Sequence, residues 1–198
     1  LYVQYVDYIA GLLRGDMGYS YLRGTEASTI VLARVPATVE LAVAATVVAT
    51  VIAIPLGVIS ATRRRDPADY GATLFSLVGI STPNFWLGIM LILVLSVQFD
   101  LFPPSRRPIG LFETLAFLVT IENGIAAPMN VDAFLNGLWT WLWHIALPAV
   151  TLGTYFTALV TRLTRSGMVE ELGQPYVRAA RAKGLPESLI QYKHALQN

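Results

Sequence analysis

The 198-residue chain has no cysteine and few charged residues. Asp, Glu, Lys and Arg make up 14% of it, whereas a soluble globular domain has about 25%. The absence of cysteine excludes a disulfide scaffold, and a hydrophobic content of 55% excludes a disordered chain. A formal net charge of +1 excludes nucleic-acid binding that depends on net basicity. The composition therefore favours an integral membrane protein.

Three long stretches contain no Asp, Glu, Lys or Arg, namely residues 41–62, 70–99 and 133–161. A bilayer core about 30 Å thick is crossed by roughly 20 helical residues, so each stretch is long enough to span it. Backbone groups inside lipid must bond within their own segment, which requires helices. We therefore predict an all-α integral membrane fold with spans at about 41–62, 72–97 and 145–161.

The third span is shorter than its uncharged stretch because tryptophans precede it. Trp139, Trp141 and Trp143 favour the headgroup region, which places His144 near the membrane interface. The alternative places His144 within the membrane, where an ionisable group would have a functional role.

The distribution of Lys and Arg predicts the orientation. Segments 62–71 and 162–198 carry nine of these residues, whereas the longer segments 1–37 and 98–144 carry five. The positive-inside rule places the first pair of segments in the cytoplasm and the second pair outside. We expect an extracytoplasmic segment over 1–37, an outer loop over 98–144 and a cytoplasmic loop over about 166–198.

Two prolines mark positions of interest along the spans. Pro36 is expected in the first turn of the first long helix, with Glu40 near the helix N-terminus, where a carboxylate complements the dipole. Pro83 lies near the middle of the second span, between Ser81 and Thr82 on one side and Asn84 on the other. These polar groups either bond to carbonyls freed by the proline or belong to a broken helix that lines a translocation path. Both interpretations remain open, and the candidate path residues are Ser81, Thr82, Pro83 and Asn84.

The cytoplasmic stretch 173–185, GQPYVRAARAKGL, predicts a short helix with small side chains. Pro175 suits its first turn, the alanines favour helix, and Gly184 suits the position just after its end. Small side chains allow a partner surface to approach closely. A basic loop attracted to anionic lipid would have the same composition.

This stretch resembles the EAA loop of ABC importer permeases, which reads Glu-Ala-Ala, three residues, Gly, nine residues, Ile-x-Leu-Pro. Here Arg178-Ala179-Ala180 takes the first place and Gly184 follows at the required spacing, while His194-Ala195-Leu196-Gln197 takes the last. Arg178, His194 and Gln197 depart from the general pattern in the manner of B-type subunits of the dipeptide/oligopeptide/nickel branch. The resemblance extends to VPATVELA (35–42), IPLGVISA (54–61), GISTPNFWLG (79–88), LPAVTLG (147–153) and RLTRSGMVEELGQ (162–174).

The resemblance implies a type I ABC importer transmembrane fold with about six spans, of which residues 38–198 would hold three. The chain lacks an initiator Met and ends within a helical pattern, so we expect it to be part of a longer protein. The implied partners are a second homologous permease, two ATP-binding subunits and an extracytoplasmic solute-binding protein, in the cytoplasmic (inner) membrane of a prokaryote. The residues implied to dock on an ATPase are Tyr176, Arg178, Ala179, Ala180, Arg181, Lys183, Gly184 and Leu185.

The sequence has no GxxxxGK[ST] phosphate-binding loop, so energy would come from a partner, and no cofactor, metal site or catalytic residue is expected. An ion-coupled carrier or channel would need paired ionisable groups within the membrane, and the predicted spans offer none apart from His144. An intramembrane enzyme would need a nucleophile and a base or metal ligands, but the chain has two histidines and no cysteine. The sequence does not identify the solute, whether dipeptide, oligopeptide, nickel or glutathione.

Overall fold

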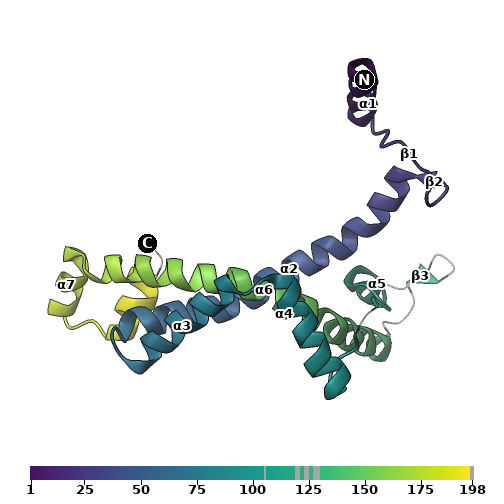
Figure 1. The fold of residues 1–198 in the computed structure, drawn as a ribbon. Coiled ribbons are helices and arrows are strands. Elements are labelled where there is room, and N and C mark those ends of the chain that lie inside the picture. The colour runs from purple at the N-terminus through teal and green to yellow at the C-terminus, as the bar shows by residue number, and fades with distance from the viewer. Residues whose placement is uncertain (105, 119–120, 123–124, 127–129, 197–198) are drawn as a thin grey trace.

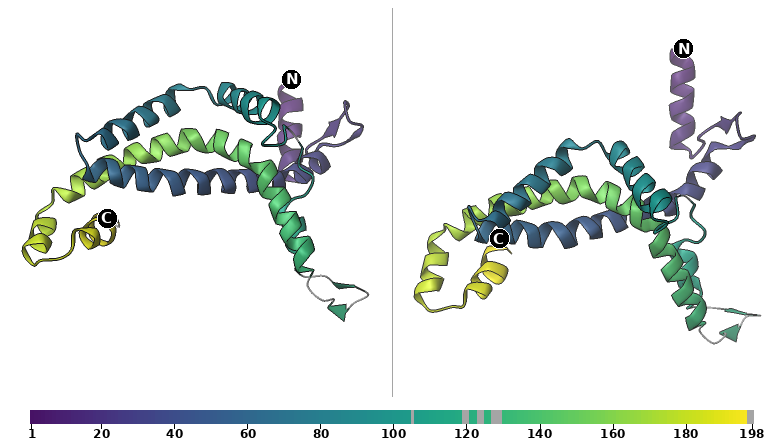
Figure 2. Two further views of the ribbon diagram at one scale, coloured as in Figure 1. Left: turned by 90° about the horizontal axis from the view of Figure 1, so that it is seen from below. Right: turned by 60° about the horizontal axis from the view of Figure 1, so that its bottom comes forward.

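The computed structural model describes residues 1–104, 106–118, 121–122, 125–126 and 130–196. Three long helical segments lie side by side in it: α2 (Ala27–Thr62), the bent pair formed by α3 (Pro67–Ser81) and α4 (Asn84–Leu91), and α6 (Val131–Leu172). Figure 1 and both views of Figure 2 show α3 and α6 running along α2. A π-helix, η1 (Ile92–Gln98), continues α4.

Shorter elements gather at the two ends of this bundle. One end carries α1 (Tyr2–Leu13), the hairpin of β1 (Tyr19–Ser20) and β2 (Thr25–Glu26), and α5 (Leu111–Ala116). The hairpin of β3 (Ile121–Glu122) and β4 (Ile125–Ala126) lies there too. The other end carries α7 (Pro175–Ala182), α8 (Glu187–Leu189) and η2 (Ile190–Ala195) (Figure 1). In each hairpin the strands are antiparallel; Tyr19 pairs with Glu26, and Ile121 pairs with Ala126.

The bundle has small residues inside and large apolar residues outside. On α2, Ala45, Ala49, Ala53, Gly57 and Ala61 recur every four residues and are all buried. This spacing places them on one face of the helix. Most of the larger apolar side chains of α2 lie on its other faces, although Val58 is buried. The exposed ones are Val31, Leu32, Val35, Val39, Val43, Val47, Val51, Ile52 and Ile59. This arrangement is typical of helices that contact each other through small residues and face lipid with large ones.

Glycines permit the close approach of the three helices. A methyl group built on Gly57 would lie 2.6 Å from Thr164 Cβ of α6, and one on Gly79 would lie 2.9 Å from Ala158 Cβ. On α6 itself, a methyl group on Gly153 would lie 3.2 Å from the Ala45 carbonyl oxygen. The contacts of Gly57 and Gly153 show that α2 runs parallel to α6. Gly79 meets Ala158, whereas Asp69, earlier in α3, bonds to Arg165, later in α6, so α3 runs antiparallel to both.

Among the described residues, α2 and α6 are each long and apolar enough to cross a membrane. The bent segment formed by α3, α4 and η1 makes a third span if it is counted as one. The three uncharged stretches of the sequence thus lie in the three predicted helical segments. The helices are longer than the predicted spans, since α2 begins at Ala27 and α6 extends from Val131 to Leu172. Residues 131–144, predicted in the outer loop, are the first turns of α6.

The predicted helix start at Pro36 is wrong. Helix α2 begins nine residues earlier, at Ala27, and continues through both Pro36 and Pro55. A proline inside a helix removes one backbone bond, and the turns on either side remain helical because their other bonds persist. Glu40 therefore lies well inside α2, where its carboxylate is not a helix-end feature.

Helix α6 also contains a proline, Pro148, and its first turns point away from the direction of the rest of the helix (Figure 2). The later part lies along α2 and α3, whereas the first part lies beside α5. Residues 115–121, within the predicted outer loop, include the end of α5 and the start of β3; residues 119–120 are outside the described residues.

Candidate functional site

Helix α7 is the short helix that the sequence predicted between residues 175 and 184. Pro175 occupies its first turn, and Gly184 follows its end with a φ of +77°, a conformation that suits glycine. The Gly184 N–H donates to the Arg181 carbonyl at 2.9 Å, and the Leu185 N–H donates to the Ala180 carbonyl at 3.2 Å. These two bonds form a Schellman motif, so the prediction of Gly184 as the residue after the helix end is confirmed.

Helix α7 is held against the bundle by one buried side chain and by the segment that follows it. Val177 and Ile190 are both fully buried, and η2 packs against α7 and α6. Further along η2, Ala195 joins Val58 and Met168 in a small apolar cluster between α2 and α6. The chain therefore leaves α6, makes α7, and returns to the same bundle.

Two polar contacts tie α7 to its neighbours. The Tyr176 hydroxyl lies 2.7 Å from Glu171 Oε2 of α6 and 3.3 Å from the His194 carbonyl oxygen of η2. The Arg181 guanidinium donates to both carboxylate oxygens of Glu187, at 2.6 and 3.1 Å. Hydrogen bonding by Arg181 lowers the pKa of Glu187 below its ordinary value of 4.5 and raises the pKa of Arg181. Both side chains are about half exposed, so the pair is worth little in free energy.

The outward face of α7 collects most of the predicted docking residues. Tyr176, Arg178, Ala179, Arg181, Lys183 and Gly184 are exposed, whereas Ala180 and Leu185 are half-buried. Arg178 and Lys183 have no ion-pair partner in the part of the chain that the structure describes. Gln197, the last residue of the EAA-like pattern, lies outside the described residues.

Immediately behind this region, a buried carboxylate joins three helices. Asp69, in the first turn of α3, accepts hydrogen bonds from Arg165 Nε of α6 at 2.7 Å and Nη2 at 2.9 Å. It also accepts from the Ser60 hydroxyl of α2 at 2.5 Å and from the Arg65 backbone N–H at 3.1 Å. We call this set the inner network. All four donors satisfy a side chain that is only 7% exposed, as a buried charge requires.

The second candidate region is the break between α3 and α4. The two halves of the segment meet at an angle of 102° around Thr82 and Pro83. Thr82 ends α3, and its hydroxyl donates to the Val78 carbonyl at 2.7 Å. Ser81 and Pro83 are exposed, while Thr82 and Asn84 are half-buried. The Val78 carbonyl also accepts the Thr82 backbone N–H at 2.9 Å, so the Thr82 hydroxyl does not bond to a carbonyl that Pro83 leaves free. The segment is broken, as the second interpretation requires.

The break stays close to α6 on both sides. Gly79 before it and Gly88 after it both approach α6, since a methyl group on Gly88 would lie 3.2 Å from Thr151 Cγ2. The four break residues 81–84 lie between α3 and α4, away from α7, so the two groups of predicted site residues do not form one site (Figure 1).

At the opposite end of the bundle, Glu40 makes a second buried network. Its carboxylate accepts hydrogen bonds from Arg107 Nη2 at 2.8 Å and Nε at 3.3 Å. The Leu111 backbone N–H and the Trp141 indole N–H also donate to it, at 3.0 and 3.1 Å. We call this set the outer network. The interpretation of Glu40 as a helix-dipole partner is wrong, because the tertiary structure brings loop 106–110 and α6 to it.

His144 lies next to the outer network. Its Nδ1 is 2.7 Å from the Thr140 carbonyl oxygen of the same helix, and it is half-buried. It lines a cavity of about 190 Å³ together with Glu40, Arg107 and Trp141. The described residues contain no group of three or more His, Cys, Asp or Glu side chains that could hold a metal ion.

Sequence reasoning missed both networks. Each network contains an acidic residue at the edge of an uncharged stretch and an arginine that is far away in the sequence. Counting the charges in each segment does not show which acidic residue binds which arginine. The four-residue repeat of small residues on α2 was visible in the sequence and indicates a helix-packing face. It was the signal that could have predicted which side of α2 meets α6.

Comparisons of the sequence with a family model and with known proteins all point to membrane permeases of transport systems. The family model for the inner membrane component of binding-protein-dependent transport systems matches residues 53–198. The oligopeptide transport system permease protein AppB of Bacillus subtilis is 40% identical over 198 residues, a match that covers 100% of this chain and 56% of that protein. The dipeptide transport system permease protein DppB of Escherichia coli K12 is 38% identical over 202 residues, covering 100% and 58%.

A third relative, the di/tripeptide transport system permease protein DppB of Pseudomonas aeruginosa, is 37% identical over 206 residues, covering 100% of this chain and 58% of its own length. The chain thus spans little more than half the length of these relatives. The family match covers most of the chain: it begins at residue 53, within α2, and includes the rest of the bundle and the α7 region. The chain belongs to the family of inner membrane components of binding-protein-dependent transport systems.

Proposed function

We propose that this chain is part of a permease subunit of an ATP-driven importer, and that it moves peptides or a related small solute across the inner membrane. The names of its relatives, which are oligopeptide and dipeptide permeases, support the substrate class. The permease works by alternating access, together with a second homologous permease, two ATP-binding subunits and an extracytoplasmic solute-binding protein. The observation that carries the proposal is the exposed face of α7 at one end of an apolar helix bundle.

Helix α7 is suited to receive a partner protein. Its exposed small residue Ala179 leaves its backbone accessible, while Arg178 and Lys183 offer cations with no ion-pair partner among the described residues. A surface of this kind fits an acidic groove on an ATP-binding subunit. The buried Val177 makes α7 move with the bundle rather than independently of it.

The inner network offers a route for movement from α7 into the bundle. Helix α6 leads directly into α7, and Arg165 of α6 is bonded to Asp69 of α3. A displacement of α7 by the ATP-binding subunits is therefore passed to α6 and, through this pair, to α3. Helix α3 ends at the break around Pro83, where a change of angle would open or close a path lined by Ser81, Thr82, Pro83 and Asn84.

The docking role is tested by replacing Ala179 with tryptophan in the assembled complex. A bulky side chain on the exposed face should block the ATP-binding subunit without disturbing α7 itself, because Ala179 does not face the bundle. We expect loss of the ATP-binding subunits on purification and loss of peptide uptake, with normal membrane insertion. Ser188→Trp, on the exposed surface of α8, is the matched control and should retain both. Normal co-purification and uptake with Ala179→Trp would overturn the docking role.

A second test separates docking from helix termination. Gly184 has open space around it, with no atom within 4 Å of a built methyl group, but its φ of +77° is unfavourable for other residues. Asparagine tolerates a positive φ better than leucine does, so Gly184→Asn should disturb the end of α7 less than Gly184→Leu. If the small size of residue 184 matters for docking, both variants should fail in uptake. If Gly184→Asn retains full uptake, the glycine serves only to end α7.

A further inference from the structure

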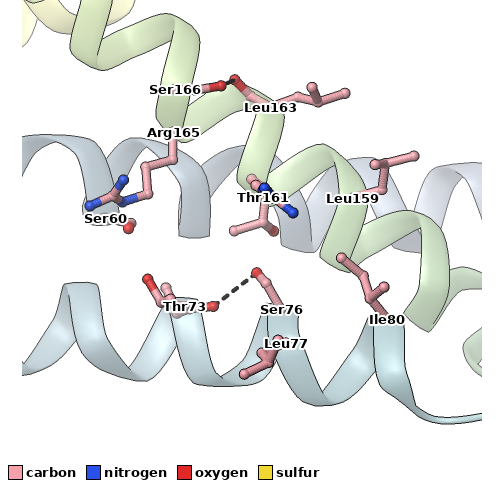
Figure 3. Close-up of a pocket in the computed structure, with 12 residues that line it drawn as sticks. Ser60, Thr73, Ser76, Leu77, Ile80, Leu159, Thr161, Leu163, Arg165 and Ser166 are labelled. Atoms are coloured by element: carbon pink, nitrogen blue, oxygen red, sulfur yellow. Dashed lines mark hydrogen bonds between the residues drawn. The ribbon is translucent and has the colours of Figure 1, made fainter.

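A large cavity lies between α3 and α6, near the end of the bundle that carries α7. Its volume is about 750 Å³, and its walls come mainly from α3 and α6 (Figure 3). We call it the α3–α6 cleft. It is neither the α7 surface nor the break at Pro83.

The cleft is polar at one end and apolar at the other. Towards the α7 end, its walls carry the hydroxyls of Thr73 and Ser166 and the side chains of Arg162 and Arg165, with Leu163 between the two arginines in sequence. Away from that end, the lining residues are Leu77, Ile80 and Leu159. Figure 3 shows this order, with Arg165 and Thr73 on one side and Leu159 and Ile80 on the other.

The polar end carries a net positive charge. The Arg165 charge is neutralised by Asp69, since the two form a bidentate pair within 2.7–2.9 Å. In contrast, Arg162 is exposed and has no hydrogen bond or ion pair in the described part of the chain. The Thr73 hydroxyl likewise has no partner there, so a guanidinium and a hydroxyl are both available as donors. Ser166 donates to the Leu163 carbonyl at 2.9 Å.

A positive polar end joined to an apolar channel matches the chemistry of an anionic phospholipid. The phosphate would meet Arg162 and Thr73, and an acyl chain would follow Leu77, Ile80 and Leu159 towards the membrane centre. Basic pockets between membrane helices on the cytoplasmic side bind anionic lipid headgroups by this means. The positive-inside rule places the α7 end, and with it Arg162, on that side.

We propose that the α3–α6 cleft is a binding site for an anionic phospholipid of the inner leaflet, with Arg162 as the residue that selects the phosphate. This site does not depend on peptide transport or on docking at α7. Its occupant fills the gap between α3 and α6 beside the inner network. We therefore expect the charge of the bound lipid to affect how strongly a movement of α6 is transmitted to α3.

The test measures lipid binding by native mass spectrometry of the full-length protein purified in its complex. We expect phosphatidylglycerol to bind to the unaltered protein more strongly than phosphatidylcholine does. Loss of one cation near a membrane surface costs about 1 kcal/mol, which corresponds to roughly fivefold weaker binding of phosphatidylglycerol to Arg162→Gln. Arg64→Gln, a change of the same charge at the same end that does not line the cleft, should bind as the unaltered protein does.

Three outcomes overturn the proposal. Equal losses in Arg162→Gln and Arg64→Gln would indicate general attraction of lipid to a basic surface. Competition by inorganic phosphate as effective as that by phosphatidylglycerol would indicate a free anion site. The third outcome comes from a photoreactive p-benzoylphenylalanine at Leu77, which is exposed in the cleft and should form an adduct with lipid. An adduct with protein alone would mean that a helix of the complex fills the cleft.

Discussion

At the end of the bundle that carries α7, Asp69 joins three long helices, whereas at the opposite end Glu40 joins α2 and α6 to a loop and to the short helix α5 that follows it. Both carboxylates are almost fully buried, both are paired with an arginine that is more than one-third exposed, and both accept four hydrogen bonds. The partners differ in kind. The side-chain donors to Asp69 come from α2 and α6, whereas Glu40 binds Arg107 of the loop, Leu111 at the start of α5 and Trp141 of α6.

This difference indicates two mechanical roles for the same chemistry. The inner network fixes the positions of long helices relative to each other, so its loss changes the spacing of the bundle. The outer network fixes a loop on the bundle, so its loss frees the loop and leaves the helices in contact through their small residues. The following variants are ordered from the largest expected effect to the smallest.

Asp69→Ala should have the largest effect on stability. The variant leaves the Ser60 hydroxyl and the Arg165 guanidinium without their acceptor, and breaking a buried pair in this way costs about 3 kcal/mol. Thermal unfolding of the purified protein measures the loss. Asp66→Ala is the matched control, because Asp66 is exposed and makes no side-chain bond at the start of α3. Equal stability of the two variants would contradict the bracing role of Asp69.

Glu40→Ala should cost less, about 2 kcal/mol, because Arg107 lies on a loop that can move towards solvent, whereas Arg165 is held on α6. The same variant should expose the loop at Arg106, and limited digestion with trypsin would detect this as faster cleavage after Arg106, since the Arg107–Pro108 bond resists trypsin. Glu26→Ala, at an exposed position of β2, should leave the cleavage rate unchanged. If Glu40→Ala unfolds as readily as Asp69→Ala, the distinction between the two networks fails.

Glycine substitutions compare the packing of the two ends. Gly57→Ala would place a methyl group 2.6 Å from Thr164 Cβ, so we expect a loss of about 2 kcal/mol through overpacking. Gly153→Ala, with its nearest contact at 3.2 Å, should lose less. Gly71→Ala has no atom within 4 Å and should be neutral or slightly stabilising, since alanine favours helix. A reversed order in measured unfolding temperatures would show that the outer half is the tighter one.

The exposed pair of Arg181 and Glu187 should have the smallest effect. The pKa of Glu187 is held below its ordinary value of 4.5 mainly by the hydrogen bond from Arg181. The stabilisation is therefore present above pH 4.5 and is lost as the pH falls through the lowered folded-state pKa. Glu187→Gln should lose less than about 1 kcal/mol at neutral pH and nothing in acid. A stability difference that persists unchanged into acid would exclude the carboxylate charge as its cause.

Much of the fold could be predicted because charge is so costly in a bilayer. Uncharged stretches located the three helical segments, and the spacing of Pro175 and Gly184 located α7. The predicted start of α2 was wrong, because a proline such as Pro36 can occupy either the first turn of a helix or its interior, and the neighbouring sequence does not distinguish the two. The 102° break lies where the second span contains Pro83, although the sequence alone did not give an angle.

The sequence by itself determined the class of protein, the uncharged membrane segments and the α7 helix, because each follows from local composition or from spacing within a few residues. Only the tertiary structure decided the partners of Asp69 and Glu40, since Arg165 and Arg107 reach them from 96 and 67 residues away. It also decided that α3 and α6 enclose a cleft with Arg162 at its polar end. Such contacts depend on how whole helices pack, and no short stretch of sequence contains that information.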